Sequence, residues 1–289
     1  MITSAKFHHF LALRETSVHL EPFTVIVGPN SSGKSTLLGG LDAGVNKRFQ
    51  NQFAKPGPMA TPQAEVSLET RYRSEDYQSA TPPLRQSLPT VCTHLQRNDP
   101  NRFALVESYL VRVIPSIQGV NCLPLNSLPV LEENAASRPE VQAEHLRFNF
   151  ENTLEVSALD VGQGTLAVLA VLLATLSAAH GPLLVLLDNL EQSLHPQTSA
   201  RLVEVLRAIQ AENPMIQIVA ATHSPYLVDQ FEPREVRVAA FDPQRGTVLA
   251  PLTQCPDFAK WSPVLRAGEL WSYVGEAWTL EHNGFPSTP

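Results

Sequence analysis

The sequence is poor in lysine and has no excess of positive charge. Only five of its 21 basic residues are lysine, and 28 acidic residues bring the formal net charge to −7. General electrostatic binding to nucleic acid or to an anionic membrane depends on clustered Lys and Arg, so this composition argues against both. A DNA contact would have to be local, and no membrane partner is indicated.

Cysteine and long apolar runs are also scarce. The three cysteines, at positions 92, 122 and 255, form neither a Cys-x-x-Cys pair nor a zinc-type cluster, which is typical of a reduced cytoplasm. The longest apolar stretch, residues 165–179, ends after about 15 residues, whereas a bilayer requires roughly 20. Residues 1–10 lack the apolar core of a signal peptide. We therefore expect a cytoplasmic protein with a buried helix beginning near residue 165.

Strand and helix patterns alternate at the two ends of the chain. Apolar runs predict strands over 23–27, 183–187 and 216–221, and helical periodicity begins near residues 35, 165, 197 and 225. This alternation favours an α/β fold with a mostly parallel sheet flanked by helices.

The middle of the chain has a weaker pattern, and 11 of the 24 prolines lie between residues 51 and 140. It predicts a strand over 64–73, a helix over 102–114 and a loop over 115–140. We expect one domain whose core comprises 1–40 and 146–289, with 41–145 inserted as a lid segment.

A glycine-rich loop follows the first predicted strand. It reads Gly28-Pro29-Asn30-Ser31-Ser32-Gly33-Lys34-Ser35, with Thr36 next, and fits the pattern Gly-x-x-x-x-Gly-Lys-Ser/Thr in full. In such a loop the backbone N–H groups and a helix N-terminus surround phosphate, Lys34 reaches the β- and γ-phosphates, and the Ser35 hydroxyl binds Mg²⁺. The loop predicts binding of ATP or GTP with Mg²⁺.

The strand at 183–187 delivers Asp188 to the sheet edge where ligands of α/β proteins bind. Its carboxylate either holds Mg²⁺ opposite Ser35 or caps the next helix. Asn189 and Glu191 follow closely, and His223 comes 35 positions after Asp188, within Thr-His-Ser-Pro.

These motifs resemble the ABC-type ATPase heads of the overcoming-lysogenization-defect, RecF and chromosome-maintenance (SMC-like) class, especially compact AAA-family members without a coiled coil. The resemblance rests on the phosphate loop, the segment 188–196, the Thr-His-Ser-Pro segment and the stretch 161–166. The strand at 7–10 with Arg14 and the segment 268–271 add to it. It implies a P-loop NTPase of the ABC type and covers about 1–40 and 146–280.

The resemblance also assigns roles. Asp188 matches the Walker B carboxylate, and His223 matches the histidine that contacts the γ-phosphate. In this class the signature of one subunit caps the ATP of another, which implies a homodimer or heterodimer. The nucleotide-binding set then includes Arg14 and the signature residues Gly162, Gln163, Gly164 and Thr165. A glutamine loop is expected at one of Gln50, Gln52, Gln63, Gln78 or Gln86.

Two positions depart from the family pattern. Asn189 stands where the family places its catalytic Glu, and an amide orients water but is no base. Gly162 stands where the family has the signature Ser, so a hydroxyl donor to the γ-phosphate is lost. We expect slow hydrolysis, unless the loop turns Glu191 inward as a substitute. The alternative is drift at tolerant positions.

Three functions remain open. The chain is an ATPase that drives a separate effector, such as a nuclease or toxin, with relatives implying DNA repair or anti-phage defence. Alternatively it is an ATP-sensing assembly subunit with little catalysis, or a DNA-binding repair head. The stretch between Gly40 and Val156 carries 11 basic and 13 acidic residues, which favours neither DNA nor an acidic partner.

Overall fold

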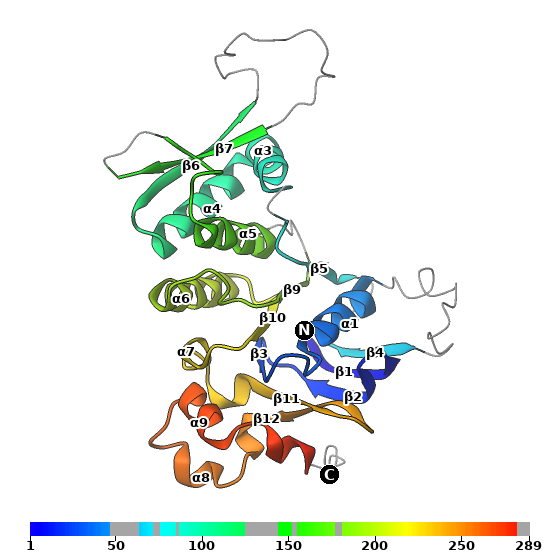
Figure 1. Ribbon diagram of the computed structural model, residues 1–289. Coiled ribbons are helices and arrows are strands. Elements are labelled where there is room, and N and C mark those ends of the chain that lie inside the picture. Colours follow the sequence, from blue (N-terminus) through cyan, green and yellow to red (C-terminus); the bar gives the residue numbers. More distant parts are fainter. Residues whose placement is uncertain are drawn as a thin grey trace, which may run out of the picture. The chain divides into compact units, whose positions relative to one another are not determined.

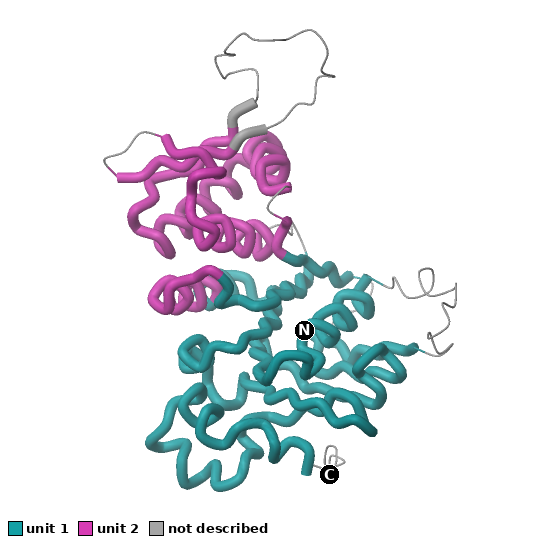
Figure 2. The backbone as a smooth tube through the Cα atoms, viewed as in Figure 1, with its two compact units in different colours: residues 1–81, 178–192, 207–289 teal, residues 82–177, 193–206 magenta. Residues whose placement is uncertain are grey.

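The computed structural model describes residues 1–46, 64–71, 76–84, 87–124, 144–151, 155–176 and 181–281. The chain divides into two compact units, shown in teal and magenta in Figure 2. The first contains residues 1–81, 178–192 and 207–289, and the second contains 82–177 and 193–206. These boundaries differ from those of the predicted core and insertion, and the single-domain assignment stays a prediction.

The first unit is built on one sheet with the order β4-β1-β2-β12-β11-β3-β10-β9-β5 (Figure 1). Its strands are β1 Ile2–Phe10, β2 Leu13–His19, β3 Phe23–Val27, β4 Glu65–Thr70, β5 Gln78–Ala80, β9 Leu183–Leu187, β10 Ile216–Thr222, β11 Val236–Asp242 and β12 Gly246–Pro251. Neighbours from β11 to β5 are parallel, and neighbours from β4 to β11 are antiparallel. The α/β class is confirmed, with the parallel arrangement confined to one half of the sheet.

The central strands form where the sequence is continuously apolar. Every residue of β3, β9 and β10 is buried, as expected for parallel strands covered on both faces. Helix α1, Lys34–Asn46, lies close to β1: a Cβ atom added at Gly40 would be 2.6 Å from a Phe7 ring carbon. The middle of α1 therefore packs directly against β1.

The C-terminal part of the first unit follows β10. It comprises α7 Pro225–Val228, α8 Phe258–Trp261, α9 Ala267–Val274 and the short 3-10 turns Pro233–Glu235, Leu252–Gln254 and Ala277–Leu280. The helix predicted from Pro225 is confirmed, although it is only four residues long.

The second unit contains α3 Leu88–Asn98, α4 Pro100–Val113, α5 Gln163–Leu176 and a small sheet of β6 Ile117–Pro124, β7 Glu144–Phe150 and β8 Val156–Ser157. Strand β6 corrects the loop predicted over 115–140, because its residues pair with β7 far along the chain. Residues 125–140 of that loop lie outside the described residues. Helix α5 is buried along most of its length, as its apolar sequence predicts.

Helix α6, Pro196–Glu212, contributes its first part to the second unit and its last part to the first. Of the helices that the structure describes, none is both long and apolar enough to cross a membrane.

Candidate functional site

The candidate site lies where three parallel strands of the first unit end. In the register, Thr222 of β10 is opposite Val27 of β3, and Ala220 is opposite Leu187 of β9. The loop that follows β3, the residue after β9 and the residue after β10 therefore emerge at one edge of the sheet. This is the edge at which open α/β sheets bind ligands, and it brings together the predicted phosphate loop, Asp188 and His223.

The two glycines of the loop are required by close packing as well as by backbone conformation. Gly28 has φ +150° and Gly33 has φ +93°. A Cβ atom at Gly28 would lie 2.2 Å from the Ala239 carbonyl oxygen of β11, and one at Gly33 would lie 1.9 Å from the Thr247 hydroxyl of β12. The loop thus rests on neighbouring strands and leads directly into α1, whose first N–H groups have no partner within a helix.

Lys34 begins α1 and is 5% exposed. Its ammonium group donates hydrogen bonds to the carbonyl oxygens of Gly28 at 3.0 Å and Pro29 at 2.7 Å. Burial lowers the pKa of Lys34, while the negative charges of Asp188 and Glu191 act in the opposite direction. A buried cation surrounded by neutral oxygens of its own loop is suited to receive an anion.

Glu191 is bound to the end of β10. Its carboxylate accepts a hydrogen bond from the Thr222 hydroxyl at 2.6 Å and another from the His223 backbone N–H at 2.7 Å. Both oxygens are engaged, and they connect the loop after β9 to the segment that carries His223.

His223 is also bound to the phosphate loop. Its Nδ1 lies 3.0 Å from the Gly28 carbonyl oxygen. A carbonyl oxygen only accepts hydrogen bonds, so Nδ1 carries the proton in this arrangement. The second ring nitrogen, Nε2, takes no part in this bond, and it donates to a phosphate oxygen when it also carries a proton.

Asp188 and Asn189 follow β9 directly. Asp188 is exposed, and Asn189 has φ +49°. The loop closes onto the sheet through the Leu190 N–H, which donates to the Ala221 carbonyl oxygen at 3.2 Å. Asn is one of the few residues that tolerate the left-handed region, so the backbone here gives a physical reason for an amide where the family pattern has Glu.

The signature residues predicted for the site lie in the second unit, at the start of α5. A Cβ atom at Gly164 would lie 2.4 Å from the Ser193 carbonyl oxygen, and the Ser193 hydroxyl donates to Gln163 Oε1 at 3.3 Å. The Thr165 N–H donates to the Gly162 carbonyl oxygen at 3.1 Å. These contacts order the N-terminal turn of α5 within its own unit.

Gly162 itself has open surroundings. A Cβ atom added at Gly162 would have no heavy atom within 4 Å, so a serine would fit there without displacing a neighbour.

Arg14 is exposed on β2 and donates to the Gln244 carbonyl oxygen at 2.7 Å. The adjacent Leu13 pairs with Gly246, which precedes the Thr247 that touches Gly33. Arg14 therefore lies on a strand next to the one that supports the phosphate loop.

Of the glutamine-loop candidates, Gln78 opens β5. The other four candidates lie outside the described residues.

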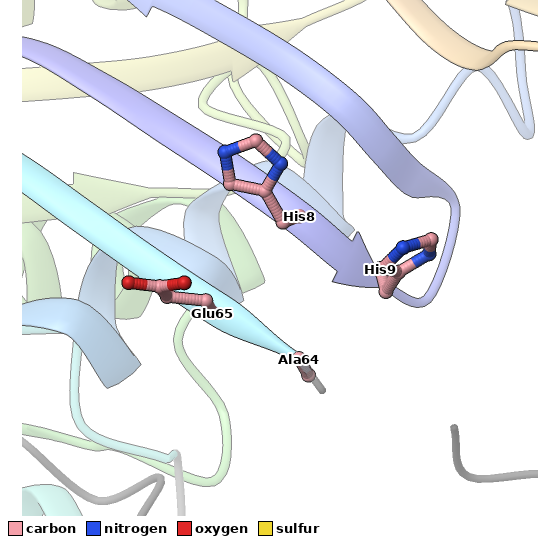
Figure 3. A pocket seen from close by; sticks show the side chains of 4 residues that line it. All are labelled: His8, His9, Ala64 and Glu65. Atoms are coloured by element: carbon pink, nitrogen blue, oxygen red, sulfur yellow. The ribbon is translucent and has the colours of Figure 1, made fainter. Parts of the chain in front are cut away.

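A surface pocket beside β1 and β4 is lined by His8, His9, Ala64 and Glu65 (Figure 3).

In the part of the chain that the structure describes, no group of three or more His, Cys, Asp or Glu side chains is placed to hold a metal ion. The assignment of Ser35 and Asp188 as Mg²⁺ ligands stays a prediction, because a nucleotide and water complete the coordination of Mg²⁺ in such sites.

Comparison with known proteins agrees with this geometry. A family model described as "AAA domain, putative AbiEii toxin, Type IV TA system" matches residues 94–229. A search of curated proteins finds no match. Among solved structures, the SMC head domain from Thermotoga maritima has 13% identity and a TM-score of 0.51, covering 86% of this chain and 98% of its own.

Two further SMC heads are similar. The SmcHead bound to the C-winged helix domain of ScpA has 11% identity and a TM-score of 0.54, covering 87% of this chain and 98% of its own. The Smc head with an extended coiled coil, bound to the C-terminal domain of ScpA derived from Pyrococcus furiosus, has 9% identity and a TM-score of 0.53, covering 91% and 99%. The chain has the fold of an ABC-type ATPase head of the SMC-like class.

The fold and the matching AAA-domain model support a nucleotide-binding ATPase in general, and the phosphate loop of this chain fits a polyphosphate. Lys34 is a buried cation that the loop alone does not neutralise, and the exposed Ser35 hydroxyl and Asp188 carboxylate are oxygen ligands of the kind that Mg²⁺ prefers.

Several residues that support the candidate site were not found from the sequence. Thr222 holds Glu191 through its hydroxyl, and Thr247 meets Gly33 from β12. The sequence did contain a signal for Thr222, because it directly precedes His223 in the Thr-His-Ser-Pro motif. Nothing in the sequence near Thr247 links it to a loop more than 200 positions away.

Proposed function

We propose that this chain binds Mg·ATP at the loop 28–36. The observation that carries the proposal is the buried Lys34, which points its ammonium group at loop carbonyl oxygens at the same sheet edge as Asp188 and His223. When nucleotide is bound, Lys34 transfers its hydrogen bonds to the β- and γ-phosphates. Ser35 and Asp188 hold Mg²⁺, and Arg14 contributes to the charge around the nucleotide.

Hydrolysis is slow in this proposal. In ATP hydrolysis water attacks the γ-phosphate, and a base or water-orienting group must position that water. Asn189 orients that water without accepting its proton, and His223 contacts the γ-phosphate. Glu191 is occupied by Thr222 and His223, which supports a role in holding the histidine rather than in deprotonating water.

The composite site forms when two heads meet. The N-terminal turn of α5, with Gly162, Gln163, Gly164 and Thr165, caps the ATP of the second head by its N–H groups and helix dipole. With Gly162 lacking a hydroxyl and Asn189 lacking a carboxylate, a homodimer retains ATP for long periods. In a heterodimer the second chain supplies the better signature and Glu.

ATP-dependent dimerisation then drives or gates a separate effector protein, a nuclease or toxin, in anti-phage defence or DNA repair. Two similar heads were solved with a bound ScpA domain, and the matching family model carries the name of a putative toxin system. Both observations favour a protein partner. The net charge of −7 speaks against a head that tracks DNA by general electrostatics.

The direct test is ATP binding measured by equilibrium titration, with Lys34→Ala as the blank. We expect saturable binding of ATP with Mg²⁺ by the native chain, loss of binding in the variant, and an ATP-dependent doubling of particle mass. Equal titration curves for the two proteins would refute nucleotide binding at this loop. Unchanged mass with ATP bound would refute the homodimer and leave the heterodimer. Stimulation of turnover by DNA ends would favour a repair head.

A further inference from the structure

The segment that carries His223 is packed against a helix near the C-terminus of the chain. This segment runs through Ser224 and α7 to Asp229, and the helix is α9, Ala267–Val274. Asp229 Oδ1 accepts hydrogen bonds from the N–H groups of Gly268 at 2.8 Å and Glu269 at 3.2 Å. A carboxylate on N–H groups in the first turn of a helix is stabilised by the helix dipole. Asp229 therefore binds α7 to the start of α9.

Because Gly268 has no side chain, α9 approaches α7 more closely than any other residue at this position would allow. A Cβ atom at Gly268 would lie 1.9 Å from the Pro225 carbonyl oxygen and 2.8 Å from Asp229 Oδ1. The nearest atom to such a Cβ belongs to the backbone of Pro225, which cannot rotate away as a side chain can. A side chain at position 268 therefore forces α7 and α9 apart. The φ of Gly268 is not positive, so the need for glycine comes from close approach alone.

The other side of α9 is anchored in the core. Ala267 is 3% exposed and Leu270 is fully buried. The Arg266 N–H donates to Glu269 Oε2 at 2.9 Å, which fixes the entry into the helix. Helix α7 is buried as well, through Leu227 and Val228, so strain introduced at Gly268 is shared between α7 and α9 and reaches the segment that begins at His223.

His223 lies only two residues before Pro225, whose ring fixes the backbone φ. The imidazole must keep its Nδ1 within 3.0 Å of the Gly28 carbonyl oxygen, and its backbone N–H is held by Glu191. A shift of Pro225 by even a fraction of an ångström would therefore be passed to the ring at the phosphate loop.

We propose that Gly268 and Asp229 are positioning residues for His223. Through them α9 sets the place of the imidazole at the nucleotide site. The proposal rests on the proposed function in one respect, namely that His223 contacts the γ-phosphate. It adds a role for the Gly-Glu-Leu-Trp segment at 268–271.

The test compares affinities for ATP and ADP in the presence of Mg²⁺, because only ATP has the γ-phosphate that His223 contacts. We expect Gly268→Ala to weaken ATP binding about tenfold while ADP binding changes less than twofold, since a misplaced histidine loses one charge-assisted hydrogen bond. Asp229→Ala should act in the same direction, and Asp229→Asn, which keeps an oxygen acceptor, should restore most of the ATP affinity. Gly39→Ala is the matched control, because its Cβ would meet nothing within 4 Å.

A double-variant cycle separates positioning from general damage. In a His223→Ala background, Gly268→Ala should have no further effect on ATP affinity. An equal tenfold loss in that background, an equal loss for ADP, or native affinities in Gly268→Ala would overturn the proposal. If Gly268→Ala fails to fold, the Asp229→Ala and Asp229→Asn pair decides by the same criteria. If the native chain binds ATP no better than Lys34→Ala, the proposed function has failed, and this result is distinct from the others.

Discussion

Replacement of Glu191 by alanine distinguishes a carboxylate that holds the site together from one that acts on water. The variant removes two short hydrogen bonds, from the Thr222 hydroxyl at 2.6 Å and the His223 N–H at 2.7 Å. Thr222 is fully buried, so water does not replace the lost partner there. Bonds to a charged group contribute about 1.5–3 kcal/mol each, and partial exposure of Glu191 reduces the sum to roughly 2–4 kcal/mol. For a chain of this size we expect the melting temperature to fall by roughly 3–7 °C.

The assay combines thermal unfolding with ATP turnover for Glu191→Ala, Glu191→Gln and a control, Glu204→Ala, on the exposed side of α6. We expect Glu191→Ala to lose stability and ATP affinity together, Glu191→Gln to be intermediate because its amide oxygen still accepts one bond, and the control to match the native chain. The reasoning is refuted if both Glu191 variants melt like the native protein and bind ATP normally but no longer hydrolyse it. That result would identify Glu191 as the substitute base.

Three further predictions concern the core, the signature and the phosphate loop. Arg207→Ala should lower the free energy of unfolding by about 2–4 kcal/mol, because the buried Glu235 loses the guanidinium that donates two hydrogen bonds to it. Denaturant unfolding measures this loss, and a loss no larger than that of Arg207→Lys would contradict the prediction. Gly162→Ser should melt like the native chain and raise the ATP-dependent dimer fraction about fivefold by restoring a hydroxyl donor, whereas an unchanged fraction in sedimentation would argue against a signature role. Burial lowers the pKa of Lys34 in the folded protein below the unfolded value of 10.5, so the folded form loses its proton first. The free energy of unfolding of the nucleotide-free protein should therefore increase as the pH rises toward that value. A free energy of unfolding that, relative to Lys34→Met, does not change from neutral pH upward would count against this.

Much of the parallel half of the sheet was predictable because its strands are continuous apolar runs. Strands β3 and β9 have the predicted bounds, Phe23–Val27 and Leu183–Leu187, since complete burial leaves a signal that needs no knowledge of the partners. In the antiparallel half, the strand predicted over 64–73 is present as β4 and the strand implied at 7–10 lies within β1, but the antiparallel pairing was not predicted. This pairing depends on contacts such as that of Leu13 with Gly246, which no local pattern encodes.

The site shows the same division between local and distant determinants. The phosphate loop is a contiguous motif, and Asp188 and His223 follow strands, so their meeting at one sheet edge follows from parallel topology. The hydrogen bond between Thr222 and Glu191 could not be predicted from topology, because it depends on how the loop after β9 closes onto β10. For the same reason the left-handed backbone of Asn189 was not foreseen.

The most direct test of the central claim is steady-state ATP turnover by the native chain and Asn189→Glu, with Lys34→Ala as the blank. Positive φ at this position costs a Glu about 1 kcal/mol relative to Asn, so Asn189→Asp, which tolerates the same backbone, is measured in parallel. The account predicts slow turnover by the native chain and faster turnover when a carboxylate is restored. Brisk turnover by the native chain, with no gain in either variant, would contradict it.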